Sequence, residues 1–210
     1  MNFFTLAASL IGLVAADHLL EITLTVDNAY FVEVTGQATQ FGPGIPVGTP
    51  NAQTGEWGTV QTKTFTLLGD GPWVVGVVGD DWGVTSAFMG VVKLNGGLLA
   101  VTGDGSWDVK EGSSVANELE VPAGWLDPDY DANANGFVTA GYDSVCLNQG
   151  AYTSVKAQIG NNVKPIWRKG GVNTCASYQP NALQNYHYYN YFRLVIPAVN
   201  GQCNVDVVDI

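Results

Sequence analysis

Asp80, Asp81 and Trp82 follow one another in the sequence, and these residue types suit the binding of a sugar. Carboxylates accept hydrogen bonds from sugar hydroxyls, and an aromatic ring packs against the apolar face of a sugar ring. The later tract 178–191 mixes tyrosines with amides, and we assign Tyr186 and Tyr188 to the same ligand-binding surface. The alternatives are an acidic hairpin with Trp82 packed at the rim of the core, and a tyrosine tract that is mostly strand.

Oxygen-bearing side chains alternate along a second stretch, at Asp127, Asp129, Asp131, Asn133 and Asn135. Ca²⁺ takes six to eight oxygen ligands, and such a loop supplies several together. The order D-A-N-A-N-G from Asp131 matches the first half of an EF-hand loop, but Tyr142 stands where that loop needs Glu. We therefore predict a structural Ca²⁺ outside any EF-hand. The alternative is a solvated loop of Asx turns.

Catalytic motifs are lacking. His18 and His187 are the two histidines, and the sequence has no Gly-x-Ser-x-Gly elbow and no glycine motif that binds phosphate. Glycoside hydrolysis needs two carboxyl groups, but nothing in the spacing of the 19 acidic residues selects a pair. We therefore expect a protein that is not an enzyme. An orphan glycosidase or lyase is a third interpretation.

Three apolar runs, 73–78, 84–94 and 98–102, are separated by Gly, Asp and Asn residues. Short apolar runs between turn residues predict buried strands, and Asn95-Gly96 predicts a hairpin. We expect an antiparallel β meander at the centre of the domain.

Further strands are predicted at 19–26 and 30–35, as a hairpin, and at 60–68, 165–168, 188–197 and 203–208. Residues 151–159 fit either a strand or a short helix, whereas 37–58 and 169–187 are polar loops. Many short strands at regular spacing indicate an all-β fold, an antiparallel β-sandwich or jelly roll.

The N-terminus carries an apolar stretch ending in Val14-Ala15-Ala16, which is typical of a secretory signal peptide. We predict cleavage after residue 16, which leaves 210 − 16 = 194 residues as a single β-sandwich domain over 17–210. The mature protein would be secreted, in the extracellular space or at the cell surface, with no membrane insertion. A net charge of −11 with 8 basic residues disfavours nucleic acid as a partner.

Three cysteines remain in the mature chain: Cys146, Cys175 and Cys203. An oxidising compartment favours one disulfide and leaves one thiol. Three pairings are open, and we favour Cys146–Cys175 because Cys203 lies near the end of the chain.

Several short motifs occur in the order found in a known family. The stretch 26–36 (VDNAYFVEVTG) is followed by 74–78, 87–94, 105–109, 124–131, 165–167 and 191–193. Together they resemble the galactose-binding-like jelly rolls that serve as accessory modules in glycoside hydrolases such as bacterial α-L-rhamnosidases. Thr35 departs from the family's usual Asn. The resemblance implies a binding module without the hydrolase, ligand at the loops of one end of the sandwich, and often a bound ion.

These observations predict a secreted, non-catalytic module that binds carbohydrate or glycoprotein and is stabilised by Ca²⁺. The alternative is a structural subunit of an extracellular assembly, a filament, coat or matrix, that self-associates through protein–protein contacts.

Overall fold

A computed structural model of the chain describes residues 17–42, 58–81, 86–112, 119–144, 146, 150–175 and 188–199. The predicted signal peptide (1–16), the predicted strand at 203–208 and Cys203 lie outside the described residues.

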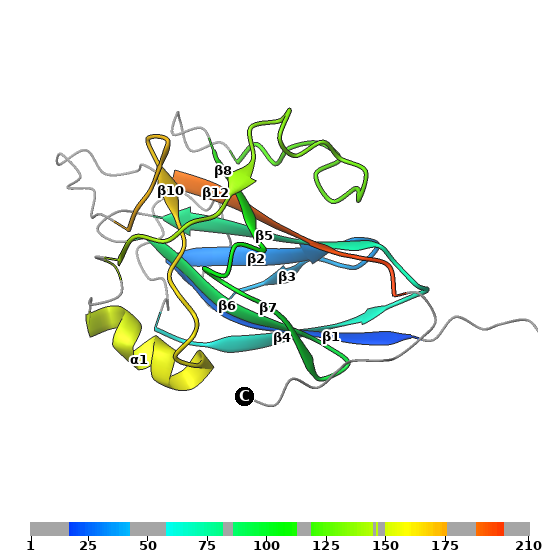
Figure 1. Ribbon diagram of the computed structural model, residues 1–210, viewed down its shortest axis with the longest axis horizontal. Coiled ribbons are helices and arrows are strands. Elements are labelled where there is room, and N and C mark those ends of the chain that lie inside the picture. Colours follow the sequence, from blue (N-terminus) through cyan, green and yellow to red (C-terminus); the bar gives the residue numbers. More distant parts are fainter. Residues whose placement is uncertain are drawn as a thin grey trace, which may run out of the picture.

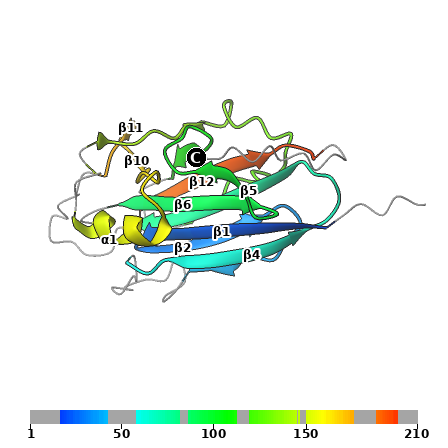
Figure 2. The same cartoon turned by 60° about the horizontal axis from the view of Figure 1, so that its bottom comes forward.

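Two antiparallel sheets pack face to face (Figures 1 and 2). The four-stranded sheet has the order β4-β1-β6-β7, formed by Gln61–Leu67, His18–Asp27, Ala87–Leu94 and Gly97–Val101. The six-stranded sheet has the order β3-β2-β5-β12-β8-β9, formed by Gln40–Phe41, Ala29–Val34, Trp73–Asp81, Tyr188–Ile196, Asp108–Glu111 and Val138–Thr139. A separate hairpin pairs β10 (Arg168–Lys169) with β11 (Val172–Asn173). The predicted all-β sandwich is thus confirmed.

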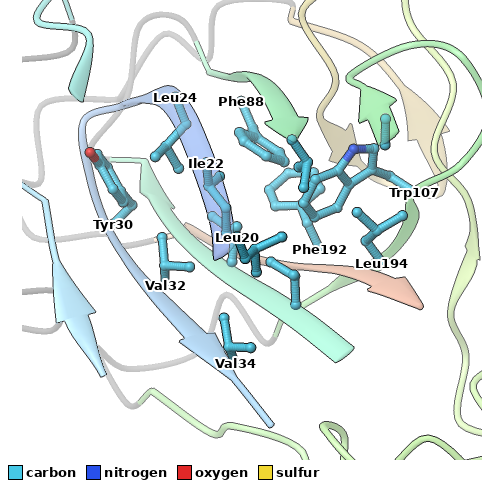
Figure 3. Packing of buried hydrophobic residues seen from close by; sticks show 14 of the residues in the cluster. Leu20, Ile22, Leu24, Tyr30, Val32, Val34, Phe88, Trp107, Phe192 and Leu194 are labelled. Atoms are coloured by element: carbon cyan, nitrogen blue, oxygen red, sulfur yellow. The ribbon is translucent and has the colours of Figure 1, made fainter. Parts of the chain in front are cut away.

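The core lies between the two sheets, where alternate residues of each strand point inward. Leu20, Ile22 and Leu24 of β1 face Tyr30, Val32 and Val34 of β2 (Figure 3). Aromatic rings also pack in this layer. The Phe88 ring lies 5.0 Å from that of Trp107 and 4.8 Å from that of Phe192, measured between centroids.

Two predicted strand pairings are wrong. The chain predicted as a hairpin over 19–35 forms β1 and β2, but these strands belong to different sheets, because the single residue Asn28 carries the chain across the sandwich. The predicted meander also divides: β5 pairs with β2 and β12, whereas β6 pairs with β1 and β7. The hairpin at Asn95-Gly96 is confirmed, since both residues have positive φ, 51° and 82°, between β6 and β7.

Residues 151–159, which fitted either a strand or a short helix, lie in the helix α1 (Gly150–Ile159). Tyr152 and Val155 of α1 pack on Ala87, Met89 and Val91 on the outer face of the four-stranded sheet. The favoured disulfide Cys146–Cys175 is confirmed, and both half-cystines are buried in this same apolar cluster. The disulfide therefore ties the chain before α1 to the chain after β11.

The edge strand β4 is contacted by side chains of neighbouring elements. Gln40 of β3 donates from Nε2 to the carbonyl of Thr64 at 2.9 Å, and Lys63 of β4 donates from Nζ to the carbonyl of Phe41 at 2.6 Å. These bonds join the two sheets along one side. In the described part of the chain, no helix has the length and apolar character needed to cross a membrane.

Candidate functional site

The strand register collects polar residues at one end of the sandwich, which we call the α1 end (left in Figure 1). There β1 ends at Asp27, β5 ends at Asp81 and β12 begins at Tyr188. Tyr188 lies opposite Asp81, and Ala29 lies opposite Asp80. Of the predicted ligand-binding residues, the structure thus brings Asp80, Asp81 and Tyr188 together. Trp82 and Tyr186 lie outside the described residues.

Asp80 and Asp81 are part of β5 and not of a turn, contrary to the boundary expected from the sequence. Neighbouring side chains in a strand point to opposite faces. Val77 packs in the central core and Val78 in the outer cluster with Tyr189. Asp81 therefore points into the sandwich and Asp80 toward its outer face. The two side chains are 1% and 0% exposed, so neither offers an open carboxylate to solvent.

Asp81 forms part of a buried polar cluster with residues that the sequence analysis did not single out. Ser86 donates from Oγ to Asp81 Oδ2 at 2.6 Å. Asp27 is 8% exposed, and its Oδ1 has no hydrogen-bond partner among the described residues. Burial, together with the negative charge of Asp81, raises the pKa of Asp27 to about 8. Asp27 therefore keeps its proton at neutral pH.

Tyr152 covers this cluster from α1. Its side chain is 2% exposed, and the hydroxyl has no hydrogen-bond partner within the described ranges. Burial raises the pKa of Tyr152, and the charges of Asp27 and Asp81 raise it further. The hydroxyl thus lies within electrostatic range of both carboxyl groups.

A second group of side chains lies beside the cluster, on β8, β10 and β12. Its residues are half-buried, and the Lys169 Nζ atom itself is buried. The Lys169 ammonium is 4.2 Å from the centroid of the half-buried Tyr188 ring, a cation–π contact. Burial lowers the pKa of Lys169, while the charges of Asp81 and Glu111 oppose that shift. Glu111 accepts hydrogen bonds from the amides of Gly170 and Gly171, at 2.8 and 3.1 Å, and so fixes the turn of the β10–β11 hairpin.

Asn190 fastens the same hairpin to the six-stranded sheet. Its Oδ1 accepts from the amide of Arg168 at 3.2 Å, and its Nδ2 donates to the carbonyl of Arg168 at 3.0 Å. The Asn190 side chain is 1% exposed and bonds to the backbone of Arg168 in the way a neighbouring strand would. Lys169 and Tyr188 are therefore held by a rigid frame of hydrogen bonds.

The predicted calcium loop lies elsewhere, on the outer face of the six-stranded sheet. The side chains of Asp127, Asp129, Asp131, Asn133 and Asn135 are all exposed. Asp127 Oδ1 accepts from the amide of Asp129 at 3.0 Å, and Asp131 Oδ1 accepts from the amide of Ala134 at 3.0 Å. The loop thus contains Asx-type bonds. No set of three or more His, Cys, Asp or Glu side chains suited to a metal ion occurs within the described residues.

Arg193 of β12 anchors this loop to the sheet. The buried guanidinium donates from Nε to the carbonyl of Trp125 and from Nη2 to the carbonyl of Asp127, both at 2.9 Å. Trp125 lies against the backbone of Gly76, where any side chain would collide with the indole. The loop is therefore a packed cover of the sheet.

An open groove of about 390 Å³ lies at the opposite end of the sandwich, between residues 35–37 and 68–73. Its one aromatic residue, Trp73, is buried and donates from Nε1 to the carbonyl of Leu68 at 3.3 Å. The Trp73 ring is thus part of the wall and does not present a free stacking face.

Comparison with known proteins found no match, whether to a family model, to a curated protein or to a solved structure.

The predicted strands 19–26 and 30–35 left three residues between them, which fits a hairpin loop and did not mark Asp27. In the structure only Asn28 separates β1 from β2, and Asp27 is the last residue before the chain crosses between the sheets. Nothing local in the sequence pointed to Tyr152 or Lys169.

Proposed function

We propose that this chain is a secreted, non-catalytic module that binds carbohydrate or glycoprotein at the α1 end of the sandwich. The observation that carries the proposal is the placement of Tyr188 and Lys169, an aromatic ring and a cation held 4.2 Å apart by a hydrogen-bonded frame. A ring of this kind packs against the apolar face of a sugar, and fixed polar groups beside it select the hydroxyls.

Aromatic residues close to Asp81 and Tyr188 in the sequence also favour the α1 end as the binding site. Trp82 directly follows Asp81, and Tyr186 precedes Tyr188 by two residues. Asp80 and Asp81 are buried, so we assign them to the support of this end and not to direct contact with the sugar. The disulfide Cys146–Cys175 fits an oxidising, extracellular setting.

The test is a screen of glycans and polysaccharides against the protein, followed by titration of any ligand found. Replacement of Tyr188 by Ala should weaken binding by at least tenfold, because the stacking face is lost; Lys169→Met should weaken it less. Phe41→Ala is the matched control, since Phe41 is an exposed ring on β3, at the far edge of the same sheet. The proposal fails if no glycan binds, or if Tyr188→Ala binds like the wild type.

A second candidate, the structural subunit, is favoured by one observation. The disulfide uses two of the three cysteines and leaves Cys203 as the third. A thiol in a secreted chain can pair with a second copy. Light scattering after size exclusion, with and without reductant, tests this. A dimer that disappears in Cys203→Ser would support assembly, whereas a monomer under both conditions would contradict it.

A further inference from the structure

Three polar groups from three different elements lie near one another at the α1 end. Asp27 lies opposite Ala87 in the strand register, Ala87 packs with Tyr152, and Ser86, the residue before Ala87, donates to Asp81. Asp27 comes from the end of β1, Asp81 from the end of β5 and Tyr152 from α1 itself. All three side chains are more than nine-tenths buried, and the two atoms Asp27 Oδ1 and Tyr152 Oη lack a hydrogen-bond partner in the described part of the chain. Buried polar atoms are nearly always satisfied, so this cluster is an exception that needs an explanation.

Two neighbouring carboxyl groups in such a site cannot both be ionised without a large cost, because little water is present to screen them. Asp81 is held by the hydroxyl of Ser86, whereas Asp27 Oδ1 receives no donor among the described residues. Asp27 is therefore the carboxyl that keeps the proton. The raised pKa of Asp27 agrees with this geometry.

The other titratable groups near the pair do not remove the cost of ionising both carboxyl groups. On α1 the facing group is Tyr152, which stays neutral because burial raises its pKa. On β10 the charge of Lys169 acts on Asp81, but it is shared with Glu111 of β8. On β5, Asp80 points to the opposite face, where it acts on Tyr189 of β12. The Asp27–Asp81 pair itself therefore determines the protonation state of the cluster.

We propose that the Asp27–Asp81 pair is a pH-sensitive switch that controls the packing of helix α1. While Asp27 keeps its proton, α1 stays closed over the outer face of the four-stranded sheet. When α1 opens, water reaches Asp27 and the carboxyl can ionise normally, so rising pH favours the open form. The disulfide Cys146–Cys175 keeps the chain before α1 attached, so the opening is local.

Opening would uncover an apolar surface that α1 now hides. Ala87, Met89 and Val91 on β6 lie under Tyr152 and Val155 of the helix. The opening would therefore expose apolar surface as pH rises. The proposal stands apart from carbohydrate binding and does not depend on it.

The direction of the effect follows from linkage. The pKa of Asp27 is about 8 in the closed form, against 3.8 for a solvated Asp. Protection of α1 should therefore be greatest below about pH 4, fall by up to about tenfold per pH unit as pH rises toward 8, and level off above that.

Hydrogen exchange of the full chain, followed by mass spectrometry and corrected for intrinsic rates, tests this between pH 5 and pH 9. In the wild type, peptides covering 150–159 should lose protection with rising pH, while peptides from β1 and β6 hold theirs. Asp27→Asn should remove the dependence, because the amide cannot ionise. Asp129→Asn, an exposed carboxyl in the 127–135 loop, should leave it unchanged.

Asp81→Asn gives a second variant in case Asp27→Asn does not fold. Without the charge of Asp81, the pKa of Asp27 should fall in part, because burial, the larger cause of its rise, remains. The loss of protection should then level off at a lower pH. A flat profile for α1 in the wild type would overturn the proposal. So would an unchanged profile in either Asn variant.

Discussion

Asp27 and Asp81 lie together at the α1 end of the sandwich although their strands, β1 and β5, belong to different sheets. Asp27 lies opposite Ala87 of β6, and Ser86, the residue before Ala87, donates to Asp81 at 2.6 Å. Burial and the charge of Asp81 both disfavour the ionised form of Asp27, so two carboxyl groups placed in this way make the fold sensitive to pH.

The first prediction concerns the stability of the whole protein. Since the pKa of Asp27 is raised to about 8 in the folded state, the contribution of this group to the free energy of unfolding falls as pH rises from about 4 to about 8. The slope is at most about 1.4 kcal/mol per pH unit. Urea unfolding at pH 5, 7 and 9 should show a decline for the wild type that Asp27→Asn reduces. Parallel curves for the two proteins would contradict it.

The second prediction concerns the aromatic core. Phe88 is fully buried against Trp107 and Phe192, so Phe88→Ala should lower the free energy of unfolding by about 3–5 kcal/mol. Phe41 is 54% exposed, and the same change there should cost less than about 1 kcal/mol. Urea unfolding of both variants measures the difference. Equal losses would mean that the two rings are not packed as described.

The third prediction concerns the cover over the six-stranded sheet. A Cβ at Gly76 would collide with the Trp125 indole, so Gly76→Ala should destabilise the protein by about 1–3 kcal/mol and displace the indole. Tryptophan fluorescence and thermal unfolding report the two effects. Gly58→Ala is the control, because nothing lies within 4 Å of its added carbon. If Gly76→Ala behaves like Gly58→Ala, Trp125 does not pack on β5.

The fourth prediction concerns the disulfide. Replacement of Cys146 and Cys175 by Ala should lower the free energy of unfolding by about 2–5 kcal/mol. Both positions pack with α1, so hydrogen exchange should show the largest gain in exchange over 150–175. A uniform gain over all strands, with no excess at α1, would argue against a local tether.

The fifth prediction concerns calcium. If the 127–135 loop binds Ca²⁺, calorimetric titration should show saturable binding that is lost in the double variant Asp129→Asn/Asp131→Asn, and chelation should lower the melting temperature of the wild type alone. Asp70→Asn, in the turn at the opposite end of the sandwich, is the matched control. No heat of binding, and no effect of chelator, would leave the loop as a set of Asx turns.

Much of the local structure could be predicted from the sequence. The alternation along 60–68 was sufficient to place Phe65 and Leu67 of β4 in the core, with Thr62, Thr64 and Thr66 outside. The apolar run at 188–197 predicted β12, and Asn95-Gly96 predicted a hairpin. These features depend on residues close in the chain, because side-chain alternation and turn geometry are local properties.

Strand pairing and the buried cluster depended on the tertiary structure. Apolar runs as alike as β5 and β6 fit either sheet, and their assignment depends on distant strands, β12 for one and β1 for the other. The pair Asp80-Asp81 resembled an exposed turn because carboxylates are rarely buried. Only the packing of α1 and β1 around Asp81 made it an interior residue, since burial is decided by segments far away in the sequence.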